Sequence, residues 1–357
     1  MKLGVMTFHQ ALNYGAALQT YGLQQYIRRN LKDVEIEVVD YRCPELSRLY
    51  STAHQRSGNP VKTLIKTGHF LLKRRHFQKF FQKHIRCSSR SYTPENIGEA
   101  VPLYDKFIVG SDQVWNPDLT NGDRNYLLEF APAEKRYAYA ASVGRAALPQ
   151  ETQQAMCRLL ADFQGLSLRE ASGAQMLKAM GLTRPVSVHI DPVLLLERKH
   201  WESLAAGVPP RKKGYVLVFT VAKSQALVDQ AVAFAKAQGL EVLYIGQHIR
   251  DSRVQYIPFL ALEKLIALFR DSDYVFTNSF HGTVLSLLFH RKFYAQAQDT
   301  DGRASRITDL LKKLELTDRM DQTCLDDLVD WNRVDATLAE QRQLAGAYLE
   351  WIAANEN

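Results

Sequence analysis

One histidine in this chain follows a predicted buried strand at the point where a helix is expected to begin. His281 and Gly282 lie in the segment Thr-Asn-Ser-Phe-His-Gly-Thr-Val-Leu-Ser at 277–286. Residues 273–276 include aromatic and β-branched side chains that predict a strand, and residues 284–289 predict an apolar helix. Ligands of open α/β sheets bind at this edge, where a helix N-terminus offers N–H groups to an anion. We therefore expect acid/base chemistry by His281 on a phosphorylated or carboxylated substrate; the alternative is a histidine that only caps its turn.

Two other predicted strand ends carry polar side chains. After the first strand, Asn13 can cap the next helix and Gly15 allows a ligand or backbone to approach closely. After the strand at 106–110, the segment Gly-Ser-Asp-Gln-Val-Trp-Asn-Pro places a tryptophan among polar residues, which suits a sugar. The alternative there is an Asx-turn with a packing tryptophan. If the ligand is a sugar that accepts a transferred group, the residues of these two segments predicted to bind this acceptor are Asn13, Tyr14, Gly15, Asp112, Trp115 and Asn116.

A guanidinium lies at a further predicted strand end, in the segment Ser-Leu-Arg-Glu at 167–170. Arg169 could hold an anion through two parallel hydrogen bonds, or it could pair with a local carboxylate. The sequence leaves both interpretations open.

Strands and helices alternate along the chain, which predicts α/β architecture with parallel sheets covered by helices on both faces. The predicted strands are 2–7, 35–40, 106–110, 136–141, 165–168, 186–190, 215–220, 241–245, 274–277 and 293–297. The predicted helices are 16–29, 150–163, 171–179, 224–238, 260–269 and 284–289.

One break divides this pattern into two Rossmann-like halves. The segment 207–214 contains two prolines, two glycines and a basic run, so we expect a boundary within 192–214. The predicted parts are an N-terminal domain at 1–195 with a basic helical insertion at 51–94, a C-terminal domain at 215–330 that carries His281, and a C-terminal helix at 331–357.

Composition narrows the class of protein. With 357 residues, the chain is long enough for two domains, and its 46% hydrophobic and 23% charged content is typical of a soluble globular protein. We expect no membrane-spanning helix and, at the N-terminus, a strand instead of a signal peptide. Cys43, Cys87, Cys157 and Cys324 show no Cys-x-x-Cys spacing, which argues against a zinc site or a disulfide framework.

The net charge of +7 comes from one segment. Residues 51–94 contain ten Lys or Arg and no Asp or Glu, while the rest of the chain has 35 basic and 38 acidic residues. Phe77, Phe80, Phe81 and His84 recur at helical spacing among these basic residues. One hypothesis is a cationic amphipathic helix on an anionic membrane or a polyanionic glycan. The other is a phenylalanine stripe in the core with a solvated basic back.

Together, the motifs resemble the polysaccharide pyruvyl transferase family. They occur in family order over residues 2–315. The matching segments are 13–19, 110–117, 139–144, 167–170, 191–195, 278–282 and 305–307. The resemblance implies a glycosyltransferase-B-like fold of two Rossmann-like domains facing a cleft. It also implies phosphoenolpyruvate as donor and a cell-surface glycan or its lipid-linked precursor as acceptor, because known members attach pyruvate as a ketal across two sugar hydroxyls and release phosphate.

The resemblance assigns residues to this chemistry. His281 is the expected catalytic acid/base, because the methylene carbon of the donor must gain a proton as a sugar hydroxyl attacks the enol carbon. The expected donor-binding residues are Arg169, Ser279, Gly282 and Arg306. One position departs from better-characterised branches, which carry an arginine where this chain has Ser279. Arg306, or Arg303 just before it, is expected to supply the missing charge; the alternative is that Arg306 is a helix-start residue facing solvent.

Two other functions stay open. A nucleotide-sugar glycosyltransferase of the same fold would bind a diphosphate at the helix start, although no Glu follows Gly282 in the matching stretch. A non-catalytic glycan- or membrane-binding protein would use residues 51–94. For the pyruvyl transferase we expect no cofactor and no metal, a glycan or lipid-linked sugar as partner, and no nucleic acid. We expect it in the cytoplasm, peripheral at the inner face of the membrane.

Overall fold

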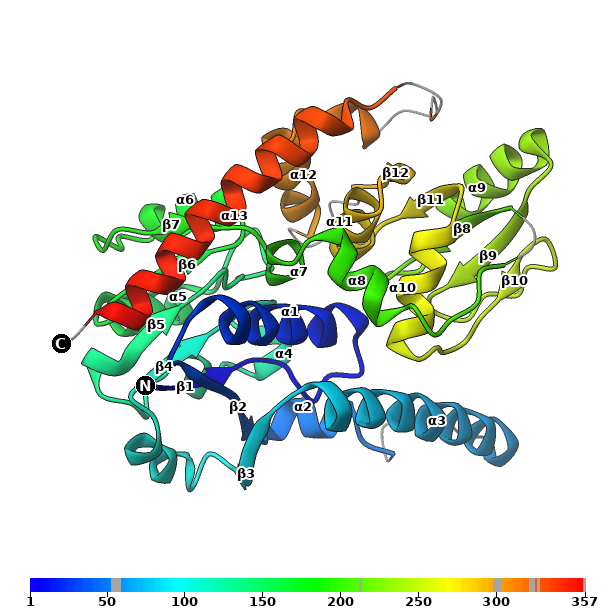
Figure 1. The fold of residues 1–357 in the computed structure, drawn as a ribbon. Helices are drawn as coiled ribbons and strands as arrows, with labels where there is room; N and C mark the ends of the chain where they lie inside the picture. The colour runs from blue at the N-terminus through cyan, green and yellow to red at the C-terminus, as the bar shows by residue number, and fades with distance from the viewer. Residues whose placement is uncertain (53–58, 212–213, 298–302, 321–324, 326–327, 356–357) are drawn as a thin grey trace. The chain divides into compact units, whose positions relative to one another are not determined.

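The computed structural model describes residues 1–52, 59–211, 214–297, 303–320, 325 and 328–355. Contacts divide the chain into two compact units, each of which contains a parallel five-stranded sheet in its described part (Figure 1). The first unit comprises Met1–Phe70, Gln78–Leu196 and Leu338–Asn357, and the second comprises Leu71–Phe77 and Glu197–Thr337. Within the described part of the chain, no helix combines the length and apolarity that crossing a bilayer requires.

The sheet of the first unit has the strand order β3-β2-β1-β4-β5. Its strands are β1 (Lys2–Met6), β2 (Glu35–Tyr41), β3 (Cys87–Tyr92), β4 (Lys106–Val109) and β5 (Arg136–Ala138). Beside it, β6 (Ser167–Leu168) and β7 (Ser187–Val188) form a short parallel pair that is bridged to the segment after β5. The central strands β1 and β4 consist almost entirely of buried residues, because helices cover both faces of a parallel sheet.

Several helices belong to the first unit. Two of them, α3 and α13, are shared, with part of each helix in either unit. The helices of this unit are α1 (Tyr14–Asn30), α2 (Pro44–Leu49), α3 (Pro60–His84), α4 (Pro117–Thr120), α5 (Gln150–Ala161), α6 (Ala171–Ala179), α7 (Pro192–Leu195) and α13 (Trp331–Ala354), with 3₁₀ turns at Ile97–Leu103, Arg124–Leu127 and Ala133–Lys135. The backbones of α1 and α7 approach closely at Gly22, where a Cβ atom would collide with the carbonyl of Pro192.

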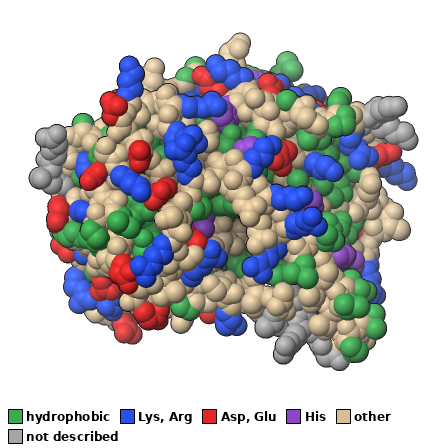
Figure 2. Space-filling model, turned by 60° about the horizontal axis from the view of Figure 1, so that its bottom comes forward, with side chains coloured by type: hydrophobic (Ala, Val, Ile, Leu, Met, Phe, Trp, Pro, Cys, Tyr) green, Lys and Arg blue, Asp and Glu red, His purple; other side chains and the backbone are tan. Residues whose placement is uncertain are grey.

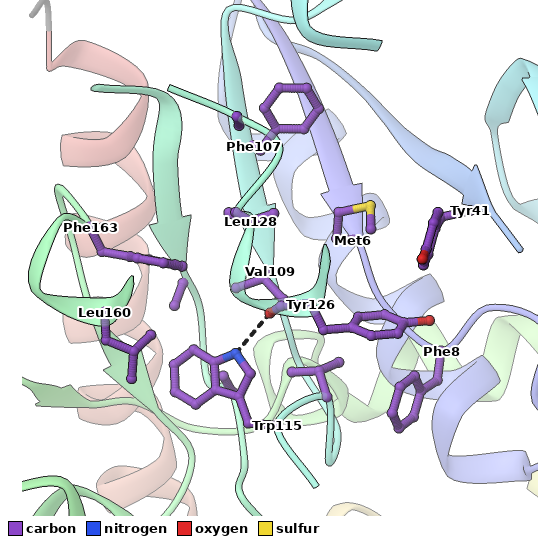
Figure 3. Packing of buried hydrophobic residues seen from close by; sticks show 14 of the residues in the cluster. Met6, Phe8, Tyr41, Phe107, Val109, Trp115, Tyr126, Leu128, Leu160 and Phe163 are labelled. Atoms are coloured by element: carbon purple, nitrogen blue, oxygen red, sulfur yellow. Dashed lines mark hydrogen bonds between the residues drawn. The ribbon is translucent and has the colours of Figure 1, made fainter. Parts of the chain in front are cut away.

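The core of the first unit lies between the sheet and the segments that follow β4. Figure 3 shows Met6 and Val109 from the central strands packed beside Trp115 and Tyr126. Leu160 and Phe163 close the same cluster from α5 and the turn after it. This core holds the segment after β4 in place at the edge of the sheet.

The C-terminal part of α13 packs on the sheet of the first unit. The Tyr348 hydroxyl donates to the carbonyl of Ala138 at 3.0 Å, and the Trp351 ring lies edge-on against Tyr137. The buried ammonium of Lys106 donates to the carbonyl of Ile352 at 2.6 Å, near the end of the helix where unsatisfied carbonyls accumulate.

The sheet of the second unit has the strand order β10-β9-β8-β11-β12. Its strands are β8 (Tyr215–Phe219), β9 (Glu241–Ile245), β10 (Gln255–Tyr256), β11 (Tyr274–Thr277) and β12 (Lys292–Ala295). Its helices are α8 (Arg198–Leu204), α9 (Gln225–Gln238), α10 (Leu262–Asp271), α11 (Phe280–Leu288) and α12 (Arg303–Lys313), with a 3₁₀ turn at Thr317–Arg319.

Both sheets share one topology. Numbered within each sheet along the chain, the strands lie in the order third, second, first, fourth, fifth. The strand order therefore reverses between β1 and β4 in the first unit, and between β8 and β11 in the second. Ligands of such folds bind outside the carboxyl ends of the strands at this reversal. The segments after these four strands are consequently the places to look for a site.

The ten predicted strands and six predicted helices are all present. One predicted boundary is wrong in a way that matters for the site: α11 begins at Phe280, not at residue 284, so His281 and Gly282 are helical. The strands β3 and β10 and the helices α2, α4, α7, α8 and α12 were not predicted, because they are short, polar or at a sheet edge.

Candidate active site

The segment after β1 leads into α1 at the edge of the first sheet. The Asn13 side chain accepts hydrogen bonds from the backbone N–H of Gly15 at 2.8 Å and of Ala16 at 3.4 Å. This confirms the prediction that Asn13 caps the helix. Asn13 is exposed, whereas Tyr14 and Gly15 are buried in the first turn of α1.

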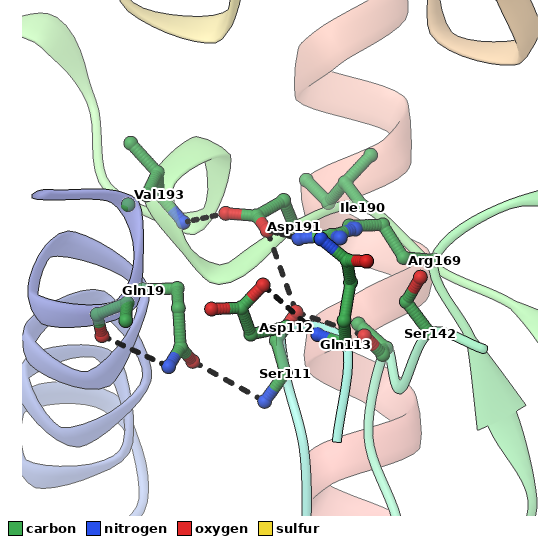
Figure 4. Close-up of polar contacts among 12 residues, drawn as sticks. Gln19, Ser111, Asp112, Gln113, Ser142, Arg169, Ile190, Asp191 and Val193 are labelled. Carbon is green, nitrogen blue, oxygen red and sulfur yellow. Dashed lines mark hydrogen bonds and ion pairs between the residues drawn. The ribbon is translucent and has the colours of Figure 1, made fainter. Parts of the chain in front are cut away.

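The segment after β4 lies next to it and is held by α1. The Gln19 side chain accepts from the Ser111 N–H at 3.2 Å (Figure 4). It also donates to the Thr7 hydroxyl at 2.8 Å. Asp112 has a positive φ of 75°, a conformation that costs a non-glycine residue roughly 1–3 kcal/mol and is frequent at functional sites. Burial and the nearby Asp112 charge raise the pKa of Tyr50 to about 12. The structure thus brings the two predicted acceptor segments to one edge of the first sheet.

Trp115 and Asn116 serve the fold at this edge. Trp115 is 5% exposed, its Nε1–H donates to the carbonyl of Tyr126 at 2.9 Å, and its ring packs edge-on against Phe163. Asn116 is buried and accepts from the N–H of Asp118 at 3.1 Å, capping α4. The alternative of a capped turn with a packing tryptophan describes these two side chains better than an open platform for a sugar.

A cavity of about 190 Å³ nevertheless adjoins this segment within the first unit. Its lining includes Trp115, Thr120, Asp123, Arg124, Glu151 and Thr152. Apolar side chains, among them Val114, Leu127 and Met156, make up most of the rest of the lining. The hydroxyl, carboxylate and guanidinium groups of this cavity can form hydrogen bonds with a ligand.

Arg169 lies just beyond β6 and is almost entirely buried among carboxylates. Its Nη1 is 2.7 Å from Asp191 Oδ2, and its Nε is 3.6 Å from Glu170 Oε2 (Figure 4). Both carboxylates have further donors: Val193 N–H donates to Asp191, and the Ser142 hydroxyl donates to Glu170. Burial alone would lower the pKa of Arg169, but these negative charges outweigh it and raise that pKa. This is the local pairing that the sequence left open, so an anionic donor would have to displace a carboxylate to reach the guanidinium.

A histidine–carboxylate pair at the same sheet edge was missed from the sequence. His9 Nε2 lies 2.7 Å from Asp40 Oδ1, and His9 Nδ1 lies 3.2 Å from the carbonyl of Thr7. Ser91 and Arg42 each donate to the other oxygen of Asp40 at 2.6 Å. His9 follows a predicted strand directly, which was a usable signal, but its partner lies 31 residues away.

In the second unit, a serine caps the helix that carries the histidine motif. The Ser279 hydroxyl accepts from the Gly282 N–H at 3.2 Å, and the Ser279 N–H donates to the Thr277 hydroxyl at 3.0 Å. Gly282 packs against the end of β11, since a Cβ atom would collide with Thr277 Oγ1. The serine that replaces the family's arginine therefore stabilises the start of α11.

His281 occupies the first turn of α11 and Arg306 lies in the neighbouring helix α12. His281 is 8% exposed, with its ring edge-on to Phe280. Arg306 is also 8% exposed, so the alternative in which it faces solvent is wrong. The helices α11 and α12 pack together, which places a buried guanidinium and an imidazole on adjacent elements of one unit. The side chain of Arg303 lies outside the described residues.

Polar side chains tie the segments after β8, β11 and β12 together. Asn278 accepts from the Val221 N–H at 3.0 Å and donates to the carbonyl of Ala222 at 2.8 Å. The Ser224 hydroxyl donates to the Gln296 side chain at 2.8 Å. Sequence reasoning assigned these residues no role, because their partners lie more than fifty residues away along the chain.

The fold is similar to that of several solved proteins at low sequence identity. A UDP-N-acetylglucosamine 2-epimerase candidate from Listeria monocytogenes has a TM-score of 0.53 at 10% identity, with 98% of this chain and 94% of that one covered. Anabaena Alr3699/HepE, solved with UDP and glucose, has a TM-score of 0.51 at 12% identity and 99% coverage of both chains. S. aureus MnaA, solved with UDP, has a TM-score of 0.50 at 11% identity, covering 100% and 98%. The chain thus has a glycosyltransferase-B-like α/β fold with two Rossmann-like units.

Sequence comparison identifies the family more directly than the fold does. No curated protein sequence matches the chain significantly. The sequence profile of the polysaccharide pyruvyl transferases, however, matches residues 13–299, from the helix cap at Asn13 past the His281 motif to beyond β12. Because this match covers most of the chain, the protein belongs to the polysaccharide pyruvyl transferase family.

Proposed function

We propose that the protein transfers a pyruvyl group from phosphoenolpyruvate to two hydroxyls of a sugar in a cell-surface polysaccharide or its precursor. One sugar hydroxyl oxygen bonds to C2 of the donor and gives its proton to a base, while C3 gains a proton from an acid and becomes a methyl group. A second hydroxyl then replaces phosphate at C2, and its proton passes to a base. The products are a cyclic ketal and inorganic phosphate. Phosphoenolpyruvate is a substrate here, and no cofactor takes part.

The observation that carries this proposal is the position of His281 in the first turn of α11, at the strand reversal of the second sheet. An imidazole can give and take protons near neutral pH. The N-terminus of α11, with the Gly282 backbone in its first turn, carries partial positive charge that favours the donor phosphate or carboxylate. Arg306, buried in the adjacent α12, adds a full positive charge to the same unit.

The remaining predicted residues take supporting roles in this proposal. Ser279 holds the start of α11 and so the position of His281. Arg169 acts through its carboxylate partners, which order the segments after β4 and β7, and it is a positioning residue unless the donor displaces Asp191. The acceptor sugar binds at the edge of the first sheet, near Asn13 and Asp112 and the adjoining cavity. The proposal places the enzyme in the cytoplasm, with a peripheral membrane contact through residues 51–94.

The test is phosphate release from phosphoenolpyruvate with a competent acceptor, together with detection of the ketal methyl group by NMR. His281→Ala should lower turnover by roughly 10²–10⁴-fold while donor binding is largely kept, because general acid/base catalysis typically contributes that much. His248→Ala is the matched control, since His248 is an exposed histidine of the same unit, beside the Tyr256 ring. Near-normal turnover of His281→Ala would show that the ring only packs in its turn.

A nucleotide-sugar glycosyltransferase is the second candidate, because two proteins of similar fold were solved with UDP. A thermal-shift comparison separates the two, since a ligand stabilises the folded state that binds it. Phosphoenolpyruvate should raise the melting temperature. If a uridine- or guanosine-diphosphate sugar raises it and phosphoenolpyruvate does not, the glycosyltransferase assignment replaces ours.

A further inference from the structure

Helix α3 presents apolar side chains on two opposite faces. Phe70, Phe77 and Phe80 are buried, and the Phe80 ring lies 5.6 Å from that of Tyr21. This confirms the interpretation of the phenylalanine stripe as core packing. At 100° per residue, a second stripe lies about half a turn away from it. Its large side chains are between 46% and 74% exposed: Val61, Leu64, Ile65, Leu71 and Leu72.

Positive charge continues this outer stripe toward the C-terminus of α3. The whole of α3 contains seven Lys or Arg and no Asp or Glu. Arg75 and Lys79 are exposed on the same face as the stripe, one to two turns after Leu71 and Leu72, whereas Lys62 and Lys66 lie on the side of the buried phenylalanines. Lys73 is different: it is partly buried over the Phe77 ring at 5.8 Å. Figure 2 shows one face of the molecule, where hydrophobic and basic side chains lie side by side on the right with few acidic ones among them.

We propose that the outer face of α3 docks on an anionic lipid surface. Single exposed apolar residues are ordinary, but a contiguous apolar stripe that continues into basic residues on the same face is typical of helices that lie in a membrane interface. Val61, Leu64 and Ile65 enter the headgroup region, and Arg75 and Lys79 contact lipid phosphates. This inference rests on the proposed function only in naming the residues that would make its peripheral membrane contact. It does not depend on which group the enzyme transfers.

Two other occupants fit less well. A second copy of the chain would bring two cationic helices face to face, and like charges repel at contact distance. A soluble polyanionic glycan would pair with the basic residues but would leave the apolar stripe in water. An anionic bilayer satisfies both the charge and the apolar surface.

The experiment is cosedimentation of the full chain with vesicles of phosphatidylcholine alone or mixed with phosphatidylglycerol. Binding should require the anionic lipid and should weaken in 1 M salt, where the Debye length falls to about 3 Å. Arg75→Gln with Lys79→Gln should reduce partitioning by roughly 25-fold, because each basic residue near an anionic surface contributes roughly fivefold. Leu64→Ser with Ile65→Ser should abolish measurable binding while the melting temperature stays unchanged.

Matched controls lie elsewhere in the first unit. Leu103→Ser removes a leucine that is 52% exposed, and Arg29→Gln with Lys32→Gln removes two exposed charges from the end of α1. Neither should change vesicle binding. The proposal is overturned if the wild type ignores anionic vesicles or if the Leu64 and Ile65 variants bind as well as the wild type. It is also overturned if those variants dissociate a dimer, or if binding to a soluble anionic polysaccharide replaces binding to vesicles. Because the readout is sedimentation, it is separate from any failure of pyruvyl transfer.

Discussion

Replacing Arg169 by glutamine is expected to destabilise the first unit whether or not a donor is bound. The Arg169 side chain is 1% exposed, and the carboxylates beside it, Asp191 and Glu170, are 0% and 4% exposed. Glutamine retains much of the volume and can still donate hydrogen bonds. It leaves the two buried carboxylates without a positive charge beside them, and these unbalanced charges are expected to lower the stability of the fold.

The magnitude follows from the burial of the pair. Removing one partner of a buried ion pair costs about 3–5 kcal/mol, because the other charge stays buried and uncompensated. A typical domain is stable by only about 5–15 kcal/mol. In a domain of about 150–250 residues, 1 kcal/mol shifts the melting temperature by about 2–4 °C, so the expected drop is roughly 6–20 °C.

The assay is thermal unfolding followed by circular dichroism, with and without phosphoenolpyruvate. The matched control is Arg48→Gln, which breaks the Arg48–Glu45 pair on the surface of the same unit, where an ion pair contributes little. If Arg169→Gln melts at the wild-type temperature but is no longer stabilised by phosphoenolpyruvate, the guanidinium contacts the donor and our structural assignment fails.

Substitutions at three further positions test other parts of the site. Burial alone would raise the pKa of Asp40, but hydrogen bonds from His9 and its other donors hold that pKa well below its usual range. This stabilisation is present above the unfolded-state pKa of about 3.9 and is lost as the pH falls below it. The urea midpoint of Asp40→Asn should therefore lie below that of the wild type at pH 7, and the difference should shrink progressively as the pH falls below about 4. Ser279→Ala should cost about 1 kcal/mol by urea unfolding, whereas Ser279→Thr, which keeps a hydroxyl at this buried position, should retain the helix cap and lose less; a larger loss for Ser279→Thr than for Ser279→Ala would contradict the cap. Gly282→Ala should cost about 1–3 kcal/mol, because its methyl group meets the Thr277 hydroxyl, and an unchanged midpoint would show that the strand end yields.

Much of the fold was predictable from local patterns. The helix α6 was predicted at 171–179 and is observed there, and β8 and β11 were predicted within one residue. A strand or helix buried in a parallel α/β fold carries an apolar pattern whatever its partners are. The edge strand β3 was missed, because its sequence Cys-Ser-Ser-Arg-Ser-Tyr has no such pattern and is a strand only through pairing with β2.

The candidate site was predictable in part. The Asn13 cap and the place of His281 at the end of β11 follow from short sequence signals. The start of α11 was misplaced by four residues, although Ser279 is a good helix-capping residue. We expected a loop around His281 and Gly282, and this expectation outweighed the capping signal from Ser279.

By itself, the sequence determined most of the buried strands and helices, the order in which they occur, and which residue types stand at the strand ends. The tertiary structure alone decided what those side chains do there. Trp115 packs inward because the Tyr126 carbonyl accepts a hydrogen bond from its N–H. The positive charge of Arg169 is balanced because the fold brings the Asp191 carboxylate against it. In α3, periodicity shows two apolar stripes equally well, and only the packing of Phe80 on Tyr21 decides which one is buried. A residue type limits the interactions a side chain can make, but its burial and its partner depend on segments that lie far away along the chain.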